Sequence, residues 1–195
     1  MELREAPLPV ASKSEPGLNL LFVGSLGYVA NSDAILYFAR EILPLIRRET
    51  DIPVRLTIAG QSPPAEVQAL DNPPNTIVTG WVESVIPLYA DADICILPIR
   101  IGSGTRFKAL EALNLGRPIV STALGVEGLG LVPETHYLRG DTPQEFAEAC
   151  LRIARDKTLR EALVTNGRLR FRDEFSRAAA LRRLKTALGT IGLET

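Results

Sequence analysis

The sequence predicts an α/β fold, a Rossmann-like parallel sheet with helices on both faces. Apolar runs of strand length alternate along the chain with longer segments in which apolar residues recur every three or four positions, the pattern of βαβ units. The first run, LNLLFVG (Leu18 to Gly24), is almost entirely apolar, as is typical of a strand buried on both faces. These observations predict one domain over residues 18–188, with a linker-like arm before it (1–17) and a tail after it (189–195).

The individual elements are expected in the following order. Strands are predicted over 18–24, 53–60, 75–82, 93–99 and 117–122, with a short one near 136–138. Helices are predicted from Asn31, with Asn31 or Ser32 as N-cap, near 65–70, over 83–92 and over 105–115, the last of them stopped by Gly116. Further helices close the chain, the first capped by Thr142 with Pro143 at its first position.

Composition narrows the class of partner. The 195 residues suffice for one domain, and 46% hydrophobic with 23% charged residues is typical of a soluble globular protein. Because 22 basic residues meet 23 acidic ones, the net charge of −1 gives no field that would gather nucleic acid. The one histidine, His136, and two separated cysteines, Cys95 and Cys150, which we expect to be buried thiols, do not predict a metal site.

The start of the chain predicts a cytoplasmic protein. Residues 1–17 carry acids and prolines where a signal peptide would have a basic start and an apolar core, and no later run reaches about 18 apolar residues. Peripheral attachment at the inner face of a membrane stays open.

Four glycine-bearing turns mark the expected ligand rim, because ligands of open parallel sheets bind beyond the carboxyl ends of the strands. The turns are Gly24-Ser25, Gly60-Gln61, Gly80-Trp81 and Gly102 to Thr105. Each alone is explained by backbone requirements. Together they predict one binding edge.

The turn GSGTRFK is the most informative of the four. Its backbone amides open a helix, where free N–H groups and the helix dipole favour an anion. Arg106 and Lys108 lie in the same turn, although that dipole disfavours positive side chains by some tenths of a kcal/mol. A bound phosphate explains them, and the alternative is that they are exposed residues of no function.

Two further residues have alternative interpretations. Glu111 flanks the expected apolar stripe of Phe107, Leu110 and Leu113, so it faces either the rim or plain solvent. At the rim its carboxylate could accept hydrogen bonds from both hydroxyls of a ribose. Trp81 is either a core residue or a stacking platform.

Three parts of the sequence resemble the C-terminal domain of family 4 glycosyltransferases. They are FVGSLGYVANSDAILYFAREILPLI, VTGWVESVIPLYADADICILPIRIGSGTRFKALEALNLGRPIVSTALGVEGL and the acidic helix after RGD. These are retaining GT-B enzymes that use nucleotide-sugar donors. The resemblance covers residues 18–188 and is closest to members of bacterial exopolysaccharide assembly. It implies one half of a GT-B fold.

The resemblance also implies roles for individual residues. Glu111 matches the second glutamate of the family's E-x7-E pattern, which binds the donor ribose, whereas the first glutamate, for the sugar hydroxyls, falls at Ser103. The amides of Gly104, Thr105 and Arg106 match the backbone that cradles the diphosphate and the sugar. Backbone near Gly60, Trp81 and Val82 is expected to bind the base.

A second departure from the family concerns charge. Many relatives supply cations to the diphosphate from a GR dipeptide after the first strand and a downstream lysine. Here the dipeptide is Gly24-Ser25, also expected at the diphosphate, and Ala30 and Asn31 lie near the lysine position. We expect Arg106 and Lys108 to replace that charge, with Arg106→Ala abolishing donor binding and Lys108→Ala weakening it.

The resemblance covers half an enzyme. The implied function is binding of a nucleotide-diphosphate sugar for transfer of a hexose-type sugar to a glycan or lipid-linked acceptor, with no metal or other cofactor. The linker-like start fits an excised C-terminal half, so the N-terminal acceptor domain is the expected partner, no catalytic residue is assigned, and the fragment alone is expected to be inactive. The final helix is expected to expose an apolar stripe or to pair with a second copy.

Two alternatives stay open. A nucleotide-sugar epimerase of GT-B fold would need paired acid/base residues, and the sequence offers only scattered carboxylates. A non-catalytic, flavodoxin-like nucleotide-binding or signalling module would lack a preference for sugar diphosphates. No GxGxxG follows the first strand, which counts against NAD.

Overall fold

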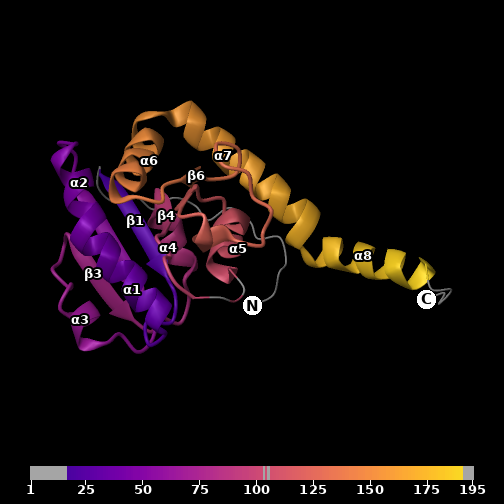
Figure 1. The fold of residues 1–195 in the computed structure, drawn as a ribbon, viewed down its shortest axis with the longest axis horizontal. Helices are drawn as coiled ribbons and strands as arrows, with labels where there is room; N and C mark the ends of the chain where they lie inside the picture. Colours follow the sequence, from indigo (N-terminus) through magenta and orange to yellow (C-terminus); the bar gives the residue numbers. More distant parts are fainter. Residues whose placement is uncertain (1–16, 103, 105, 191–195) are drawn as a thin grey trace.

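The computed structural model describes residues 17–102, 104 and 106–190 and contains a six-stranded, all-parallel sheet (Figure 1). The strand order is β3-β2-β1-β4-β5-β6, so the direction of winding reverses between β1 and β4. The strands are β1 (Leu18–Val23), β2 (Val54–Ala59), β3 (Thr76–Gly80), β4 (Ile94–Leu97), β5 (Ile119–Ser121) and β6 (Leu138–Arg139).

The central strand β1 explains why the first apolar run is almost uninterrupted. It pairs in parallel with β2 along its whole length, from Leu18 opposite Val54, and with β4 at Leu20 and Leu21. Its side chains alternate between the two faces, and helices cover both. Phe22 therefore lies in one core and Leu21 in the other.

Helices cover each face of the sheet over its own hydrophobic core. One face packs against α1 (Val29–Tyr37), the π-helical segment η1 (Phe38–Ile42), α2 (Leu43–Arg48) and α6 (Pro143–Arg155). Here Phe38 of η1 and Phe146 of α6 meet edge to face, with ring centroids 5.8 Å apart. The other face packs against α4 (Ile86–Asp91), α5 (Phe107–Asn114) and the π-helical segment η3 (Phe171–Phe175). The predicted Rossmann-like parallel sheet with helices on both faces is confirmed.

The remaining elements are α3 (Ala65–Gln68), the 3-10 turn η2 (Leu124–Val126), α7 (Lys157–Arg170) and α8 (Arg177–Thr190). Val67 of α3 and Leu163 of α7 are buried in the first core, and Val126 of η2 is buried in the second. Figure 1 shows α8 extending away from the body of the domain, and Leu181 and Leu184 on it are exposed, as expected of the final helix.

Caps explain where some helices begin. Thr142 caps α6, its hydroxyl accepting from the amide of Glu145 while the Glu145 carboxylate accepts from the Thr142 amide, and Pro143 is the first helical residue, as predicted. At α1 the predicted N-cap is wrong, because the helix begins at Val29 with Tyr28 as N-cap and no side-chain cap. The side chains of Asn31 and Ser32 bind carbonyls of the preceding loop instead.

Other expectations are refined by the structure. The helix after β4 begins at Phe107, later than predicted, with Arg106 as its N-cap. Cys95 and Cys150 are buried as expected, and burial raises the pKa of both thiols. The arm over residues 1–16 and the end of the tail over 191–195 lie outside the described residues.

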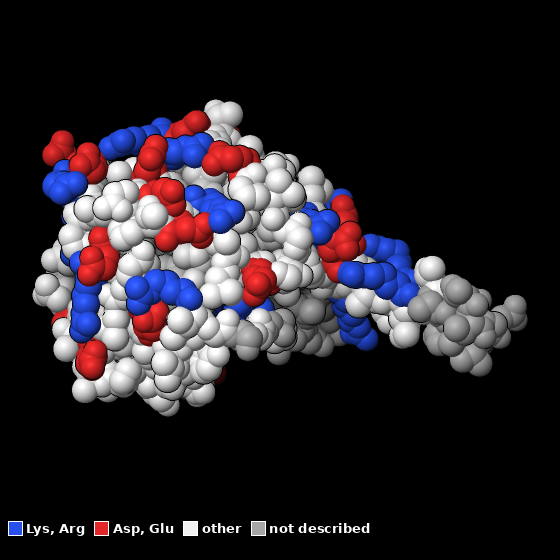
Figure 2. All heavy atoms as spheres, in the orientation of Figure 1, with Lys and Arg blue, Asp and Glu red and all other residues white. Residues whose placement is uncertain are grey.

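The visible surface mixes basic and acidic side chains without a large patch of one sign (Figure 2). This distribution agrees with the nearly balanced charge of the chain. Among the helices that the structure describes, none is long and apolar enough to cross a bilayer.

Candidate functional site

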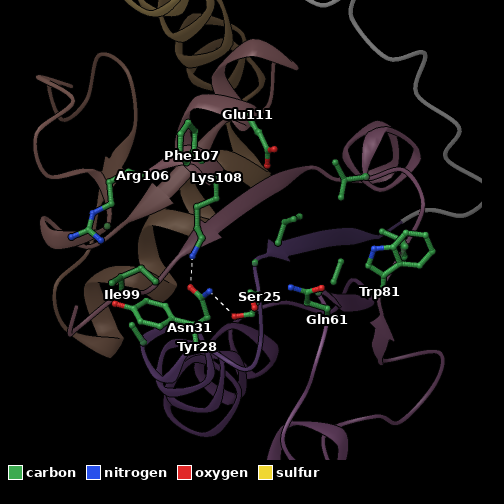
Figure 3. Close-up of a pocket in the computed structure, with 18 residues that line it drawn as sticks. Ser25, Tyr28, Asn31, Gln61, Trp81, Ile99, Arg106, Phe107, Lys108 and Glu111 are labelled. Atoms are coloured by element: carbon green, nitrogen blue, oxygen red, sulfur yellow. Dashed lines mark hydrogen bonds between the residues drawn. The ribbon is translucent and has the colours of Figure 1, made fainter. Parts of the chain in front are cut away.

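A cavity of about 470 Å³ opens beyond the carboxyl ends of β1 and β2, where the winding of the sheet reverses (Figure 3). The loops after the first four strands and the first turns of α1 and α5 line it. Of the residues predicted from the sequence, it brings together Gly24, Ser25, Gly60, Trp81, Val82, Arg106, Lys108 and Glu111. Gly104 is described but does not line the cavity, and Ser103 and Thr105 lie outside the described residues.

Lys108 reaches into the cavity from the first turn of α5. Its ammonium donates a hydrogen bond to Oδ1 of Asn31 and lies 4.9 Å from the centroid of the Phe22 ring. Burial, with a smaller contribution from the charge of Arg106, lowers the pKa of this amine to about 8, and Glu111 acts in the opposite direction. Among the described residues, Lys108 forms no ion pair with a carboxylate.

The position of this ammonium is electrostatically unfavourable in the absence of a ligand. Asn31 lies in the first turn of α1, so the ammonium sits by the positive end of that helix dipole. Its bonded partner is a neutral amide, and Arg106 is a second cation close enough to affect its pKa. A bound anion would supply the negative charge that the neutral amide lacks, and it would offset the unfavourable effects of the helix dipole and of Arg106.

Two glycines bring the backbone close to this point. A Cβ added at Gly24 would lie 3.0 Å from Nδ2 of Asn31 and 3.3 Å from Nζ of Lys108. A Cβ at Gly60 would lie 1.7 Å from the carbonyl oxygen of Gly24. These two predicted site residues therefore allow the loops after β1 and β2 to approach each other and the Lys108 ammonium.

Arg106 lies apart from Lys108, although both lie at the start of α5 (Figure 3). Its Nη2 donates to the carbonyl of Gly102 at 3.3 Å and lies 3.6 Å from Oε2 of Glu127. Only 11% of the side chain is exposed. The guanidinium thus braces the loop before α5, in addition to lining the cavity.

Glu111 occupies the cavity wall on the next turn of α5. The hydroxyl of Tyr89, a buried residue of α4, donates a hydrogen bond of 3.3 Å to Oε2 of Glu111. Burial raises the pKa of this carboxyl, and the bond from Tyr89 and the charge of Lys108 partly offset the effect. The alternative in which Glu111 faces plain solvent is wrong, because its partly buried side chain lines the cavity.

Aromatic side chains lie at the cavity without being part of the core. Trp81 follows β3 at the opposite end of the cavity from Arg106 (Figure 3), and 70% of its surface is exposed, so its interpretation as a core residue is wrong. Phe107 is 50% exposed and lines the cavity, whereas the sequence pattern assigned it to the buried stripe with Leu110 and Leu113.

Two residues of the site have contacts that the sequence did not predict. Asn31 had the signal of an N-cap, yet its amide binds Lys108, and Tyr89 lay in a short helix without a recognised motif. No group of three or more His, Cys, Asp or Glu that could hold a metal ion occurs in the part of the chain that the structure describes.

The comparisons with known proteins identify the family. Residues 17–156, more than half of the chain, match the family described as glycosyl transferases group 1. An uncharacterized 44.6 kDa protein of the cps region of Klebsiella pneumoniae is 29% identical over 120 residues, which are 57% of this chain and 31% of that protein. The chain therefore spans about a third of the length of this curated relative.

Solved structures share the fold at low sequence identity. Sucrose-phosphate synthase from Thermosynechococcus elongatus has a TM-score of 0.68 at 22% identity, covering 91% of this chain and 46% of that one. HepE from Anabaena, solved with UDP and glucose, has a TM-score of 0.68 at 12% identity, covering 89% of this chain and 48% of that one.

A third structure, the C-terminal domain of a group 1 glycosyl transferase, LpcC, from Francisella tularensis, corresponds to this chain over most of both lengths. Its TM-score is 0.65 at 15% identity, and the match covers 83% of this chain and 88% of that one. The chain belongs to the group 1 glycosyl transferases, and its fold is that of the C-terminal, Rossmann-like half of their GT-B architecture.

Proposed function

We propose that this chain is the donor-binding half of a retaining glycosyltransferase and that its cavity binds a nucleotide-diphosphate sugar. The observation that carries the proposal is the Lys108 ammonium, which is held in the cavity by a neutral amide beside the N-terminus of α1. A diphosphate supplies the negative charge that this site lacks. Lys108 and Arg106 provide its cations, so the proposed site requires no metal ion.

The other parts of the donor follow from this anchor. Glu111, oriented by Tyr89, lies on the same helix as Lys108 and accepts hydrogen bonds from the ribose hydroxyls. The base lies at the end of the cavity formed by Gly60, Trp81 and Val82. We expect the sugar to lie beyond the diphosphate, toward Gly104.

The contribution of this chain to transfer is electrostatic. When the bond between the anomeric carbon and the diphosphate breaks, negative charge grows on the leaving phosphate, and a preorganised ammonium stabilises that charge. We assign the acceptor site to a second domain outside these residues, because the chain spans only about a third of its Klebsiella relative. The chain alone binds donor without transferring a hexose-type sugar to its glycan or lipid-linked acceptor.

Two observations support this assignment. HepE, which shares the fold, was solved with UDP and glucose and, separately, with UDP-glucose. Glu111 is also the only carboxylate among the described residues that line the cavity. One carboxylate suits donor binding better than the paired acid/base chemistry of an epimerase.

We expect the whole enzyme to act in the cytoplasm, at the inner face of a membrane when its acceptor is lipid-linked.

Isothermal titration calorimetry of the chain with UDP, GDP, dTDP, their glucose conjugates, ATP and NAD tests the proposal. We expect at least one nucleoside diphosphate or its sugar to bind, and Lys108→Met to weaken it about tenfold or more, the loss of a charge-assisted hydrogen bond. Lys157→Met is the matched control, because Lys157 lies on α7 in an exposed ion pair with Glu161. Equal binding of NAD, or no binding of any diphosphate, would contradict the proposal.

A further inference from the structure

We propose that Asn31 is a positioning residue that holds the Lys108 ammonium at the phosphate end of the cavity while adding no charge of its own. The inference rests on the proposed function, because a diphosphate is the anion that this ammonium would meet. It assigns a role in the site to α1, where the sequence indicated Asn31 as an N-cap candidate and as a neutral residue near the lysine position of relatives.

Two hydrogen bonds of opposite polarity fix the amide of Asn31. Its Nδ2 donates to the carbonyl of Ser25 at 2.7 Å, and its Oδ1 accepts from Nζ of Lys108 (Figure 3). Reversing the amide would direct its N–H groups at the ammonium and its oxygen at a carbonyl, so both bonds would be lost. Since only 7% of Asn31 is exposed, water could not readily replace them.

These bonds give the Lys108 side chain a direction. Ordering the flexible stem of a lysine costs rotamer entropy. The Phe22 ring beneath the ammonium is attractive but does not select one direction around it. Oδ1 of Asn31 does, so the ammonium is already in place when the ligand arrives.

The neutrality of Asn31 is as important as its hydrogen bonds. A carboxylate at this position would hold the ammonium but would also cancel its charge. The acid two residues further along α1, Asp33, is paired with Arg100 at 2.6 Å. Of the charged groups that act on Lys108, Arg106 adds positive charge, and Glu111 lies on the following turn of α5. The site therefore keeps its positive charge for a ligand.

The contact between Asn31 and Lys108 joins the tips of two side chains that enter from opposite elements (Figure 3). Exchanging them would place a lysine on α1 and an asparagine on α5. The ammonium and the amide would then lie in nearly the same region of the cavity, with the ammonium supplied by α1 and the amide by α5. Recovery of binding in the exchanged pair would show that the position of the charge matters, whichever helix supplies it.

The experiment measures UDP affinity by calorimetry in five proteins: the natural chain, Asn31→Ala, Asn31→Asp, Lys108→Asn and the double exchange Asn31→Lys/Lys108→Asn. Asn19→Ala is the matched control, because Asn19 lies on β1 and its side chain donates to the carbonyl of Asp91, outside the cavity. Circular dichroism and thermal unfolding confirm that each variant is folded.

We expect Asn31→Ala to weaken UDP about tenfold, the effect of one hydrogen bond to a charged group, and Asn31→Asp to weaken it further through repulsion. Lys108→Asn should lose binding, and the double exchange should recover most of it. Natural affinity in Asn31→Ala, or a double exchange that binds no better than Lys108→Asn, would overturn the inference. If the natural chain bound no nucleoside diphosphate, the proposed function itself would fail; if Asn31→Ala did not fold, the double exchange would decide alone.

Discussion

The phenol of Tyr89 and the carboxylate of Glu111 form a hydrogen bond of 3.3 Å between α4 and α5, on the wall of the cavity. Tyr89 is 1% exposed, so its hydroxyl has one fixed place from which to donate. The bond orients the carboxylate of Glu111 and leaves its other oxygen, Oε1, available to a ligand. The two elements that carry these residues follow β3 and β4, which are not neighbours in the sheet.

Tyr89→Phe removes this donor and nothing else of the side chain. We expect UDP to bind about threefold to tenfold more weakly, because Glu111 loses both its orientation and a group that keeps it ionised. Inorganic pyrophosphate should bind as before, since it has no ribose. Calorimetry with both ligands checks the expectation. Tyr137→Phe, in a buried tyrosine that does not line the cavity, is the control, and an equal loss for pyrophosphate would contradict the role given to Tyr89.

Lys108→Met is expected to stabilise the ligand-free protein while it weakens donor binding. Burial lowers the pKa of Lys108 from 10.5 to about 8, so the charged amine costs folding free energy below pH 8, at most about 3 kcal/mol. The lost bond to Asn31 offsets part of this, which leaves a gain on the order of 1 kcal/mol, or a few degrees in Tm.

The pH dependence of the stability difference between Lys108→Met and the natural chain tests this explanation. Above pH 8 the folded protein releases the Lys108 proton while the unfolded chain retains it up to about pH 10.5, so the penalty disappears as pH rises through this interval. Thermal unfolding at pH 7 and pH 10 should therefore show the stabilisation by Lys108→Met at the lower pH and its reduction at the higher one. Lys157→Met should show neither effect.

Arg106→Ala should weaken donor binding less than Lys108→Met does, the reverse of the order expected from the sequence. The Arg106 guanidinium already has the carbonyl of Gly102 and the carboxylate of Glu127 as neighbours, whereas Lys108 has no anionic partner among the described residues. Titration of UDP into both variants compares them directly. A larger loss in Arg106→Ala would assign the main phosphate contact to the guanidinium.

The fold and the location of the cavity were predictable because they depend on short-range patterns. Alternating strand and helix periods predict a parallel sheet, and the carboxyl ends of such strands share one edge. The glycines were predictable for the same reason: Gly24 and Gly60 are the last residues of the predicted strands 18–24 and 53–60, where a side chain would collide with the neighbouring loop.

The contacts inside the cavity were not predictable in this way. Lys108 and Asn31 are 77 residues apart in the chain, and Tyr89 and Glu111 are 22 apart. Their partnership depends on how helices pack across the sheet. Local rules instead favoured Asn31 as a cap and left Trp81 open between a core residue and a stacking platform, since caps and cores are the commonest uses of such residues in isolation.

Because α8 extends beyond the domain, amide exchange in this helix reports whether another surface packs on it. Ala179 is buried near its start, but Leu181 and Leu184 face solvent, and a single helix of this length is marginal in water without packing. Amide protons after Leu181 should therefore exchange with deuterium quickly in this chain alone. Slow exchange there would report that a second apolar surface had covered the helix.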